Sequence, residues 1–358
     1  MMLLALLYVF VFVVGIFVGR FLNVCVGRLP YEKSLIWPGS RCGSCRQPIR
    51  WFDKVPLVSY LILRGRCRAC GARIPLRLWF VELGTGVAFV GLFHLEMVAN
   101  VLDLPMIRDR WGVAPGMVPL EALVVFAHHA VLLSFLLAAS LCDLADMEIP
   151  MSITFWGTFV GLVLSALLPW PVPEAVMAPA IGPWGNVAAL PTGAYAWPLW
   201  HPLPEWLPAG SWRLGLATGF AGALAGMAVL RVVRFLFQLG RGIEGMGVGD
   251  ADLMMMAGAF VGWQPIILAF FVSVFPALVF AGVRFAVTRR QDLPFGPSLS
   301  LGVLLTVLAW TVLGPAFQSM FFDYIFIGLL AAAGAIALLA TSFLLRVAIG
   351  PESREDGD

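Results

Sequence analysis

The run EALVVFAHHAVLLSFLLAASLC, residues 121–142, is followed at once by DLADMEIP, residues 143–150. After its first residue the run has no acidic or basic side chain other than two histidines, and it has the roughly 20 residues that a helix needs to cross a bilayer. The eight residues after it bring three acids close together. The pattern predicts a membrane helix that ends in carboxylates at one membrane boundary.

The composition of the whole chain agrees with this interpretation. Of the 358 residues, 60% are apolar and 12% are charged, whereas ordinary globular proteins have about 25% charged residues. One water-soluble core cannot hide so many apolar side chains, so lipid is the expected solvent. We therefore predict an all-α polytopic membrane protein with eight or nine transmembrane helices, chosen from these candidates: 3–19, 79–99, 121–142, 152–169, 213–233, 250–263, 265–285, 297–314 and 325–345.

The distribution of charge predicts the orientation. Twelve of the 23 Lys and Arg residues lie between Arg20 and Arg77, where only Glu32 and Asp53 oppose them. Because cytoplasmic loops are enriched in Lys and Arg, this loop is expected inside and the N-terminus outside. The first apolar run has no leading basic residue and no cleavage site, so we expect a retained helix. The net charge of +2 gives no indication of a nucleic-acid partner, and none is expected.

These features predict a division of the chain into five parts. The parts are a first transmembrane helix, a cytoplasmic metal-binding module, a membrane-embedded domain, an outer-face loop inserted in that domain, and a polar tail. The corresponding residues are 1–19, 20–78, 79–345, 170–212 and 346–358.

Four cysteines form two close pairs inside the basic loop. Cys42-Gly-Ser-Cys45 and Cys67-Arg-Ala-Cys70 are two C-x-x-C pairs separated by 21 residues. Four thiolates suit the tetrahedral preference of Zn²⁺, and Gly43 and Gly71 are expected to let the backbone turn close to the metal. A reducing cytoplasm argues against disulfides. Structural zinc is the prediction and a redox pair is the alternative, while a catalytic zinc is disfavoured because four cysteines leave no open position.

Two aspartates stand out at predicted membrane boundaries on the cytoplasmic side. Asp143 ends the third span, and Asp250 opens the sixth in the loop Gly247-Val-Gly249-Asp250. Two carboxylates brought together share a proton, and such a pair can hydrolyse a peptide. The glycines Gly247 and Gly249 would let a substrate strand approach closely.

A plainer interpretation exists for each of these acids. Asp250 precedes a helical run and fits an N-cap, and any single boundary acid can simply be solvated. Asp146 is the alternative partner if Asp143 points away. The histidines His128 and His129 are expected to be satisfied or pore-facing rather than metal ligands, and the spacing Gly222-x-x-x-Gly226 favours helix packing over a site.

From about residue 15 to 315 the chain resembles the bifunctional prepilin leader peptidase and N-methyltransferase family. The resemblance rests on several motifs in the family's order. They are Gly19-Arg20-Phe21-Leu22-Asn23-Val24, Arg28-Leu29-Pro30, the cysteine pairs with Val55-Pro56-Leu57-Val58-Ser59-Tyr60-Leu61 and Arg64-Gly65-Arg66-Cys67, Val81-Glu82-Leu83, the G-x-G-D signature within Gly245 to Trp263, and Pro294-Phe295-Gly296-Pro297.

The resemblance implies an aspartic endopeptidase of the bacterial inner membrane whose catalytic residues are Asp143 and Asp250. It implies substrates that are type IV prepilins or type II secretion pseudopilins, from which a short basic leader is removed. It also implies methylation of the new N-terminus with S-adenosylmethionine. For that step the 20–78 module is the expected contributor and Glu82 a weak candidate, while no cofactor-binding residue is assigned.

The sequence departs from the family pattern near both aspartates. Ala145 and Met151 stand where the family often has Asp, and Asp252 stands where it commonly has Lys. Two other functions are weighed against the peptidase. A proton-coupled transporter would need charged residues near the bilayer midplane, and a zinc-bearing scaffold without catalysis would leave the paired acid motifs unexplained.

Overall fold

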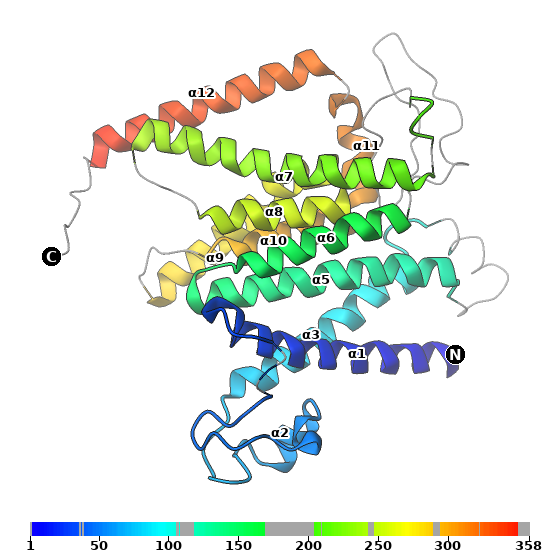
Figure 1. Ribbon diagram of the computed structural model, residues 1–358. Helices are drawn as coiled ribbons and strands as arrows, with labels where there is room; N and C mark the ends of the chain where they lie inside the picture. Colours follow the sequence, from blue (N-terminus) through cyan, green and yellow to red (C-terminus); the bar gives the residue numbers. More distant parts are fainter. Residues whose placement is uncertain are drawn as a thin grey trace. The chain divides into compact units, whose positions relative to one another are not determined.

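The computed structural model of the chain (Figure 1) describes residues 2–35, 37, 39–104, 107, 118–168, 204–208, 210–242, 247–288, 294–321 and 323–349. Most of the predicted 170–212 loop and the end of the predicted 346–358 tail lie outside these residues. Both assignments therefore stay predictions.

The described residues are almost entirely helical, which confirms the predicted all-α polytopic class. Their only β-structure is two isolated bridges, Arg41 with Pro48 and Arg66 with Arg73. The elements, in chain order, are α1 (Met2–Val26), η1 (Leu29–Tyr31), η2 (Trp51–Lys54), α2 (Val58–Ile62), α3 (Leu76–Phe93), the π-helix η3 (His94–Val98), α5 (Leu120–Asp146), α6 (Met151–Leu167), α7 (Trp212–Arg241), α8 (Val248–Val261), α9 (Trp263–Thr288), α10 (Gly296–Leu308), α11 (Trp310–Phe321) and α12 (Tyr324–Ile349).

Six segments of the described chain are long and apolar enough to cross a membrane. They are Met2–Tyr31, Leu76–Val98, Leu120–Asp146, Trp212–Arg241, Trp263–Val287 and Tyr324–Leu344. Met151–Leu167 and Gly296–Leu308 are apolar but shorter. The exact number of spans, eight or nine, stays a prediction.

Two predicted boundaries differ from the structure. The segment 297–314 is not one helix, because it divides at Ala309 into α10 and α11, and Trp310 then packs with Leu268 and Phe321. The break between α8 and α9 falls at Gly262 rather than at Pro265. Gly262 has φ +85°, a left-handed conformation that favours glycine, whereas Pro265 fits in the first turn of α9, where its missing N–H is not needed.

The chain forms two compact units, Met1–Ile153 and Thr154–Asp358. In the first unit, α1 and α3 run antiparallel and their backbones nearly touch. A Cβ added to Gly15 would lie 2.8 Å from the Cα of Gly86, and one added to Gly19 would lie 2.8 Å from the Cα of Glu82. Small residues thus let this hairpin close tightly, as in other membrane helix pairs.

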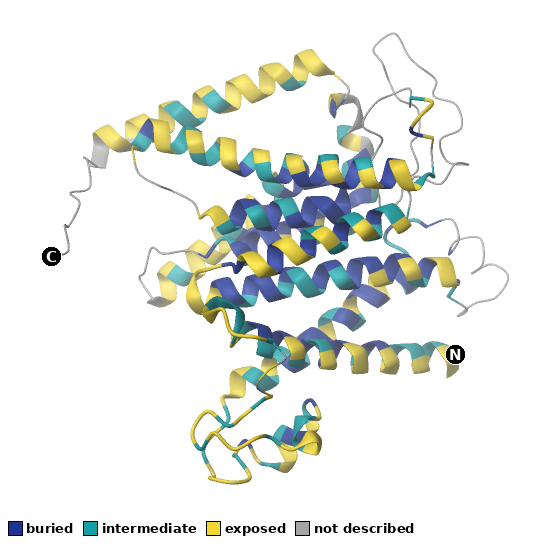
Figure 2. Ribbon diagram, in the orientation of Figure 1, coloured by how far each residue is buried: buried dark blue, intermediate teal, exposed yellow. Residues whose placement is uncertain are grey.

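In the second unit, α8 is the most enclosed helix. Figure 2 shows it as largely buried, and every residue from Met256 to Val261 is buried. It packs on α7 through glycines, since a Cβ on Gly222 would collide with the carbonyl oxygen of Gly258, and one on Gly226 would collide with that of Met254. The spacing Gly222-x-x-x-Gly226 is therefore a packing motif, as predicted.

This packing predicts a strong effect of one added methyl group. Gly222→Ala forces α7 away from α8 and is expected to destabilise the protein by about 1–3 kcal/mol, the usual range for overpacking. The measurement is thermal unfolding of the purified protein in detergent. Gly282→Ala is the control, because a Cβ at Gly282 meets no atom within 4 Å. Equal melting temperatures for both variants would contradict the close α7–α8 contact.

Candidate functional site

The two cysteine pairs form two similar tight turns. Cys42 N–H donates to the Gln47 carbonyl at 3.0 Å, and Cys67 N–H donates to the Ala72 carbonyl at 2.8 Å. In each turn the residue after the second cysteine has a left-handed backbone, Arg46 with φ +58° and Gly71 with φ +73°. The expected role of Gly71 is confirmed, whereas Gly43 is not at a left-handed position and the first turn uses Arg46 instead.

The four thiols converge on one point. The Sγ atoms of the four cysteines all lie within 4.8 Å of one another, and those of Cys42 and Cys70 are 3.8 Å apart. A tetrahedral ion with metal–sulfur bonds of about 2.3 Å requires sulfurs about 3.8 Å apart. The donor set therefore fits a single metal ion, and the four cysteines can hold one. The remaining two cysteines, Cys25 and Cys142, are buried in helices.

The surroundings of the thiols shift the pKa values of two of them in opposite directions. Backbone hydrogen bonds from Cys45 and Ser44 lower the pKa of Cys42 to about 6. Cys70 shows the opposite shift. The Ala72 backbone alone would lower its pKa, but hydrogen bonds with the neighbouring cysteines and burial raise it to about 11. Cys42 is thus largely a thiolate at neutral pH, and a bound cation would stabilise the other three cysteines as thiolates.

An ion pair joins the second turn to the rest of the module. Arg68 lies between Cys67 and Cys70, and its Nε and Nη2 atoms both donate to the Asp53 carboxylate, the shortest distance being 2.7 Å. The Arg68 hydrogen bonds hold the pKa of Asp53 below its ordinary value. A bidentate geometry of this kind fixes orientation as well as distance, so η2 is held against the second cysteine turn.

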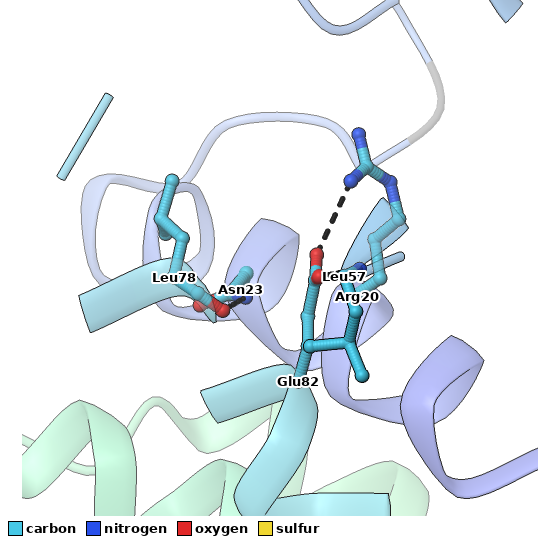
Figure 3. A network of polar contacts seen from close by, with 5 residues as sticks. All are labelled: Arg20, Asn23, Leu57, Leu78 and Glu82. Carbon is cyan, nitrogen blue, oxygen red and sulfur yellow. Dashed lines mark hydrogen bonds and ion pairs between the residues drawn. The ribbon is translucent and has the colours of Figure 1, made fainter. Parts of the chain in front are cut away.

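The carboxylate of Glu82 ties the module to the membrane helices (Figure 3). Its Oε1 lies 3.2 Å from Nη1 of Arg20 on α1, and its Oε2 accepts the Leu57 backbone N–H at 2.7 Å. Asn23 on α1 joins the two helices to each other, donating to the Leu78 carbonyl on α3 at 2.9 Å. Both oxygens of the buried Glu82 carboxylate are thus engaged within the chain. Glu82 is therefore a positioning residue for the Leu57 turn, and its part in methylation stays a prediction.

Leu57 itself has an unusual backbone. Its φ of +58° and ψ of −53° lie near the γ-turn region, which is rare and strained for a residue with a side chain. The Val58 N–H closes this turn by donating to the Pro56 carbonyl. Such a conformation persists only where the surroundings hold it, and the Glu82 hydrogen bond is the contact that does so here. No sequence pattern indicated this turn.

In the first unit, Asp143 and Asp146 lie in the last turns of α5 and differ in environment. Asp143 is 6% exposed, whereas Asp146 is exposed and accepts a hydrogen bond from the Tyr31 hydroxyl at 3.1 Å. Met147 ends the helix with a left-handed C-cap. Asp143 is therefore the buried boundary acid of this unit, and Asp146 is a solvated one.

In the second unit, Asp250 occupies the first turn of α8 and is 7% exposed. The N-cap position belongs to Gly247, so the interpretation of Asp250 as an N-cap is wrong. A Cβ on Gly247 would lie 3.7 Å from the Asp250 carboxylate, an ordinary van der Waals distance, so this glycine lies directly beside the acid. As the third residue of the helix, Asp250 lies near the positive end of the helix dipole. Its pairing with Asp143 stays a prediction.

A buried acid missed at the level of sequence is Glu96. It lies in the π-helix η3, is fully buried, and its Oε1 is 2.7 Å from Nδ1 of His129 on α5. His129 is therefore satisfied, as expected. An acid within an apolar segment was the signal that could have indicated Glu96.

These features define an integral membrane protein with a four-cysteine metal-binding module and buried aspartates at the ends of two helices. Residues 13–95 match a family profile described as Bacterial Peptidase A24 N-terminal domain, and residues 204–282 match one described as Type IV leader peptidase family. The first match includes the four cysteines and Glu82, and the second includes Asp250. Asp143 lies between the two matches. No solved structure matches the chain.

Curated relatives named Prepilin leader peptidase/N-methyltransferase cover most of the chain. The protein from Pseudomonas putida is 31% identical over 324 residues, which are 83% of this chain and 88% of the relative. That from Klebsiella pneumoniae is 30% identical over 71% of this chain and 85% of the relative. That from Myxococcus xanthus is 28% identical over 72% of this chain, which spans 57% of that longer protein. The chain therefore belongs to the prepilin leader peptidase/N-methyltransferase family.

The cysteine cluster predicts the metal content of the protein. Cys70→Ser removes one of four ligands and is expected to weaken metal binding at least about tenfold, more than the loss of a contact outside the ligand set would. The measurement is the metal-to-protein ratio of the purified full-length chain after dialysis. Cys142→Ala is the control, because Cys142 is buried in α5 and is not one of the four clustered cysteines. Unchanged metal content in Cys70→Ser would show that the four thiols are not the site.

The Glu82 contacts predict which backbone amides of the module lose protection from hydrogen exchange when this carboxylate is removed. Glu82→Ala leaves the Leu57 N–H and Arg20 without their carboxylate and should cost about 1–3 kcal/mol locally. Hydrogen exchange of the amides around Leu57 in the full-length protein is expected to become faster by one to two orders of magnitude. Glu82→Gln, which keeps an acceptor for Leu57, should have a smaller effect. Glu121→Gln, at an exposed position, should leave the exchange rate around Leu57 unchanged. Unchanged exchange in Glu82→Ala would contradict the role of Glu82 in holding the Leu57 turn.

Proposed function

We propose that this protein is a membrane aspartic endopeptidase that removes the basic leader from type IV prepilins or type II secretion pseudopilins. The observation that carries the proposal is Asp250, buried in the first turn of α8 beside Gly247 and inside the segment that matches the leader peptidase family. The 31% identity to a named leader peptidase over most of both chains supports the same activity.

Asp143 and Asp250 are the proposed catalytic carboxylates. Burial of each carboxylate favours a pair that shares one proton at neutral pH. The ionised member takes a proton from water, and the resulting nucleophile attacks the scissile carbonyl carbon. The protonated member donates to the carbonyl oxygen, and a proton then passes to the leaving amine as the peptide bond breaks. Gly247 and Gly249 are the proposed point of close approach for the substrate backbone beside Asp250.

The proposed setting is the bacterial inner membrane, with the N-terminus outside and the module and both aspartates on the cytoplasmic side. The cluster of basic residues between α1 and α3 supports this orientation. A positively charged leader stays in the cytoplasm for the same reason, so leader and aspartates would meet on one side. The apolar helix of the pilin would lie in the bilayer beside the enzyme.

Zinc is the proposed metal of the cysteine cluster, with a structural role. Four thiolates fill a tetrahedral shell, so bound zinc would hold the two cysteine turns together without an open position for chemistry. Methylation of the new N-terminus is the proposed second activity, for which S-adenosylmethionine would supply the methyl group. The names of the relatives support this step, and the module is its proposed location.

Membership of the leader peptidase family favours this function over a transporter or a scaffold. A scaffold would not need a buried acid in the first turn of α8, and a transporter is not what the relatives are named for. The proposed mechanism makes a sharper distinction, since it requires both aspartates for bond cleavage.

Asp143→Asn and Asp250→Asn are each expected to lower leader cleavage by about 10²- to 10⁴-fold, because each removes a proton donor or acceptor from the reaction. The measurement is conversion of a co-expressed prepilin to its mature form at matched membrane levels of the enzyme. Mass spectrometry of the mature N-terminus reports methylation in the same samples.

Asp146→Asn is the matched control, since Asp146 is a solvated acid three residues from Asp143 in the same helix. Its cleavage activity should equal that of the wild type. Full processing by both Asp143→Asn and Asp250→Asn would rule out the aspartic mechanism. Loss of activity in Asp146→Asn with retention in Asp143→Asn would move the catalytic role to Asp146.

A further inference from the structure

The short helix α2 presents an apolar face that nothing in the described module covers. Val58, Leu61 and Ile62 are spaced i, i+3, i+4 and so lie on one side of the helix. Their exposed fractions are 50%, 64% and 68%. The other side packs inward, where Ser59 is buried and the Tyr60 hydroxyl donates to the Ile74 carbonyl. The inward contacts of Ser59 and Tyr60 therefore fix the orientation of α2 and leave its apolar face pointing outward.

Cations flank this face. Arg64 and Arg66 follow α2 directly and are both exposed. Residues 20–78 contain twelve basic side chains and only two acids. Of these acids, Asp53 is already held by Arg68. The module thus combines an exposed apolar face with an excess of positive charge, which complements an apolar partner that carries negative charge.

The hydrogen bond from the Leu57 N–H to Glu82 fixes where α2 begins along α3. Leu57, the residue before α2, donates its N–H to Glu82, which is the seventh residue of α3 (Figure 3). At about 1.5 Å per residue, α2 therefore begins roughly 9 Å along α3 from its first residue. The membrane segment Leu76–Val98 has 23 residues, or about 35 Å, against a hydrocarbon core of about 30 Å. The excess of about 5 Å lies at this end or is shared between both ends, so α2 begins roughly 4–7 Å below the edge of the hydrocarbon core, in the outer part of the acyl chains.

We propose that α2 inserts its apolar face among the lipids near the membrane surface and binds anionic phospholipid. The side chains of Val58, Leu61 and Ile62 insert into the outer part of the acyl chains, and Arg64 and Arg66 bind the phosphate of the same leaflet. The basic leader of the proposed substrate is excluded as the occupant, because its charge would be repelled. The proposal is independent of the peptidase mechanism, since it requires only that α1 and α3 cross the bilayer.

The test places a photo-crosslinking amino acid at position 62 of the full-length protein in vesicles of equimolar phosphatidylcholine and phosphatidylglycerol. The expected product is a lipid adduct in which phosphatidylglycerol exceeds phosphatidylcholine by at least about fivefold, since each cation near an anionic surface strengthens binding by about that factor. Arg64→Gln combined with Arg66→Gln should bring the ratio close to one. Lys33→Gln combined with Arg41→Gln removes the same charge from exposed positions before the first cysteine and should leave the ratio high.

Three outcomes would overturn the proposal. They are the absence of any lipid adduct at position 62, equal loss of selectivity in both double variants, and crosslinking to an added prepilin in place of lipid. Metal content, measured for both double variants, ensures that the module is folded in each comparison. Because the readout is lipid contact and not cleavage, failure here leaves the proposed enzymatic function untouched.

Discussion

Every backbone N–H and C=O group inside a bilayer must find its partner within the protein, because lipid offers none. This constraint explains why the described chain is nearly all helix and why its polar side chains concentrate at helix ends. The few acids held deeper have dedicated partners. Glu82 is engaged by Arg20 and Leu57, and Glu96 is engaged by His129. Each of these partners lies on another element, so each buried acid also fixes a tertiary contact.

Helices in lipid gain little from burying apolar side chains, so close backbone contact has to hold them together. Glycines supply that contact in both units, Gly15 with Gly86 in the first and Gly222 with Gly258 in the second. The second contact brings α7 against α8 and leaves α8 almost wholly buried. Burial of Asp250 follows from this packing, since the aspartate lies in the first turn of the most enclosed helix of its unit.

The four-cysteine module lacks the apolar core that a domain of its size would need, and it uses directed contacts instead. The cysteine cluster can be closed by a metal, the Asp53–Arg68 pair holds η2 to the second cysteine turn, and Glu82 holds the strained turn at Leu57. All three contacts depend on a few polar atoms and not on a large buried apolar area. The depth proposed for α2 in the membrane follows from the last of these contacts.

The sequence by itself determined the membrane class, the four cysteines as one cluster, the boundary acids and the glycine packing of α7. Apolar run length, ligand spacing and composition act locally along the chain, so they are visible without a fold. Only the tertiary structure decided that Glu82 binds both Arg20 and the Leu57 N–H, and that Glu96 pairs with His129. It also decided that Asp250 is not an N-cap and that 297–314 is divided at Ala309. Those facts depend on which backbone and side-chain atoms approach from distant segments, and no local pattern contains that geometry.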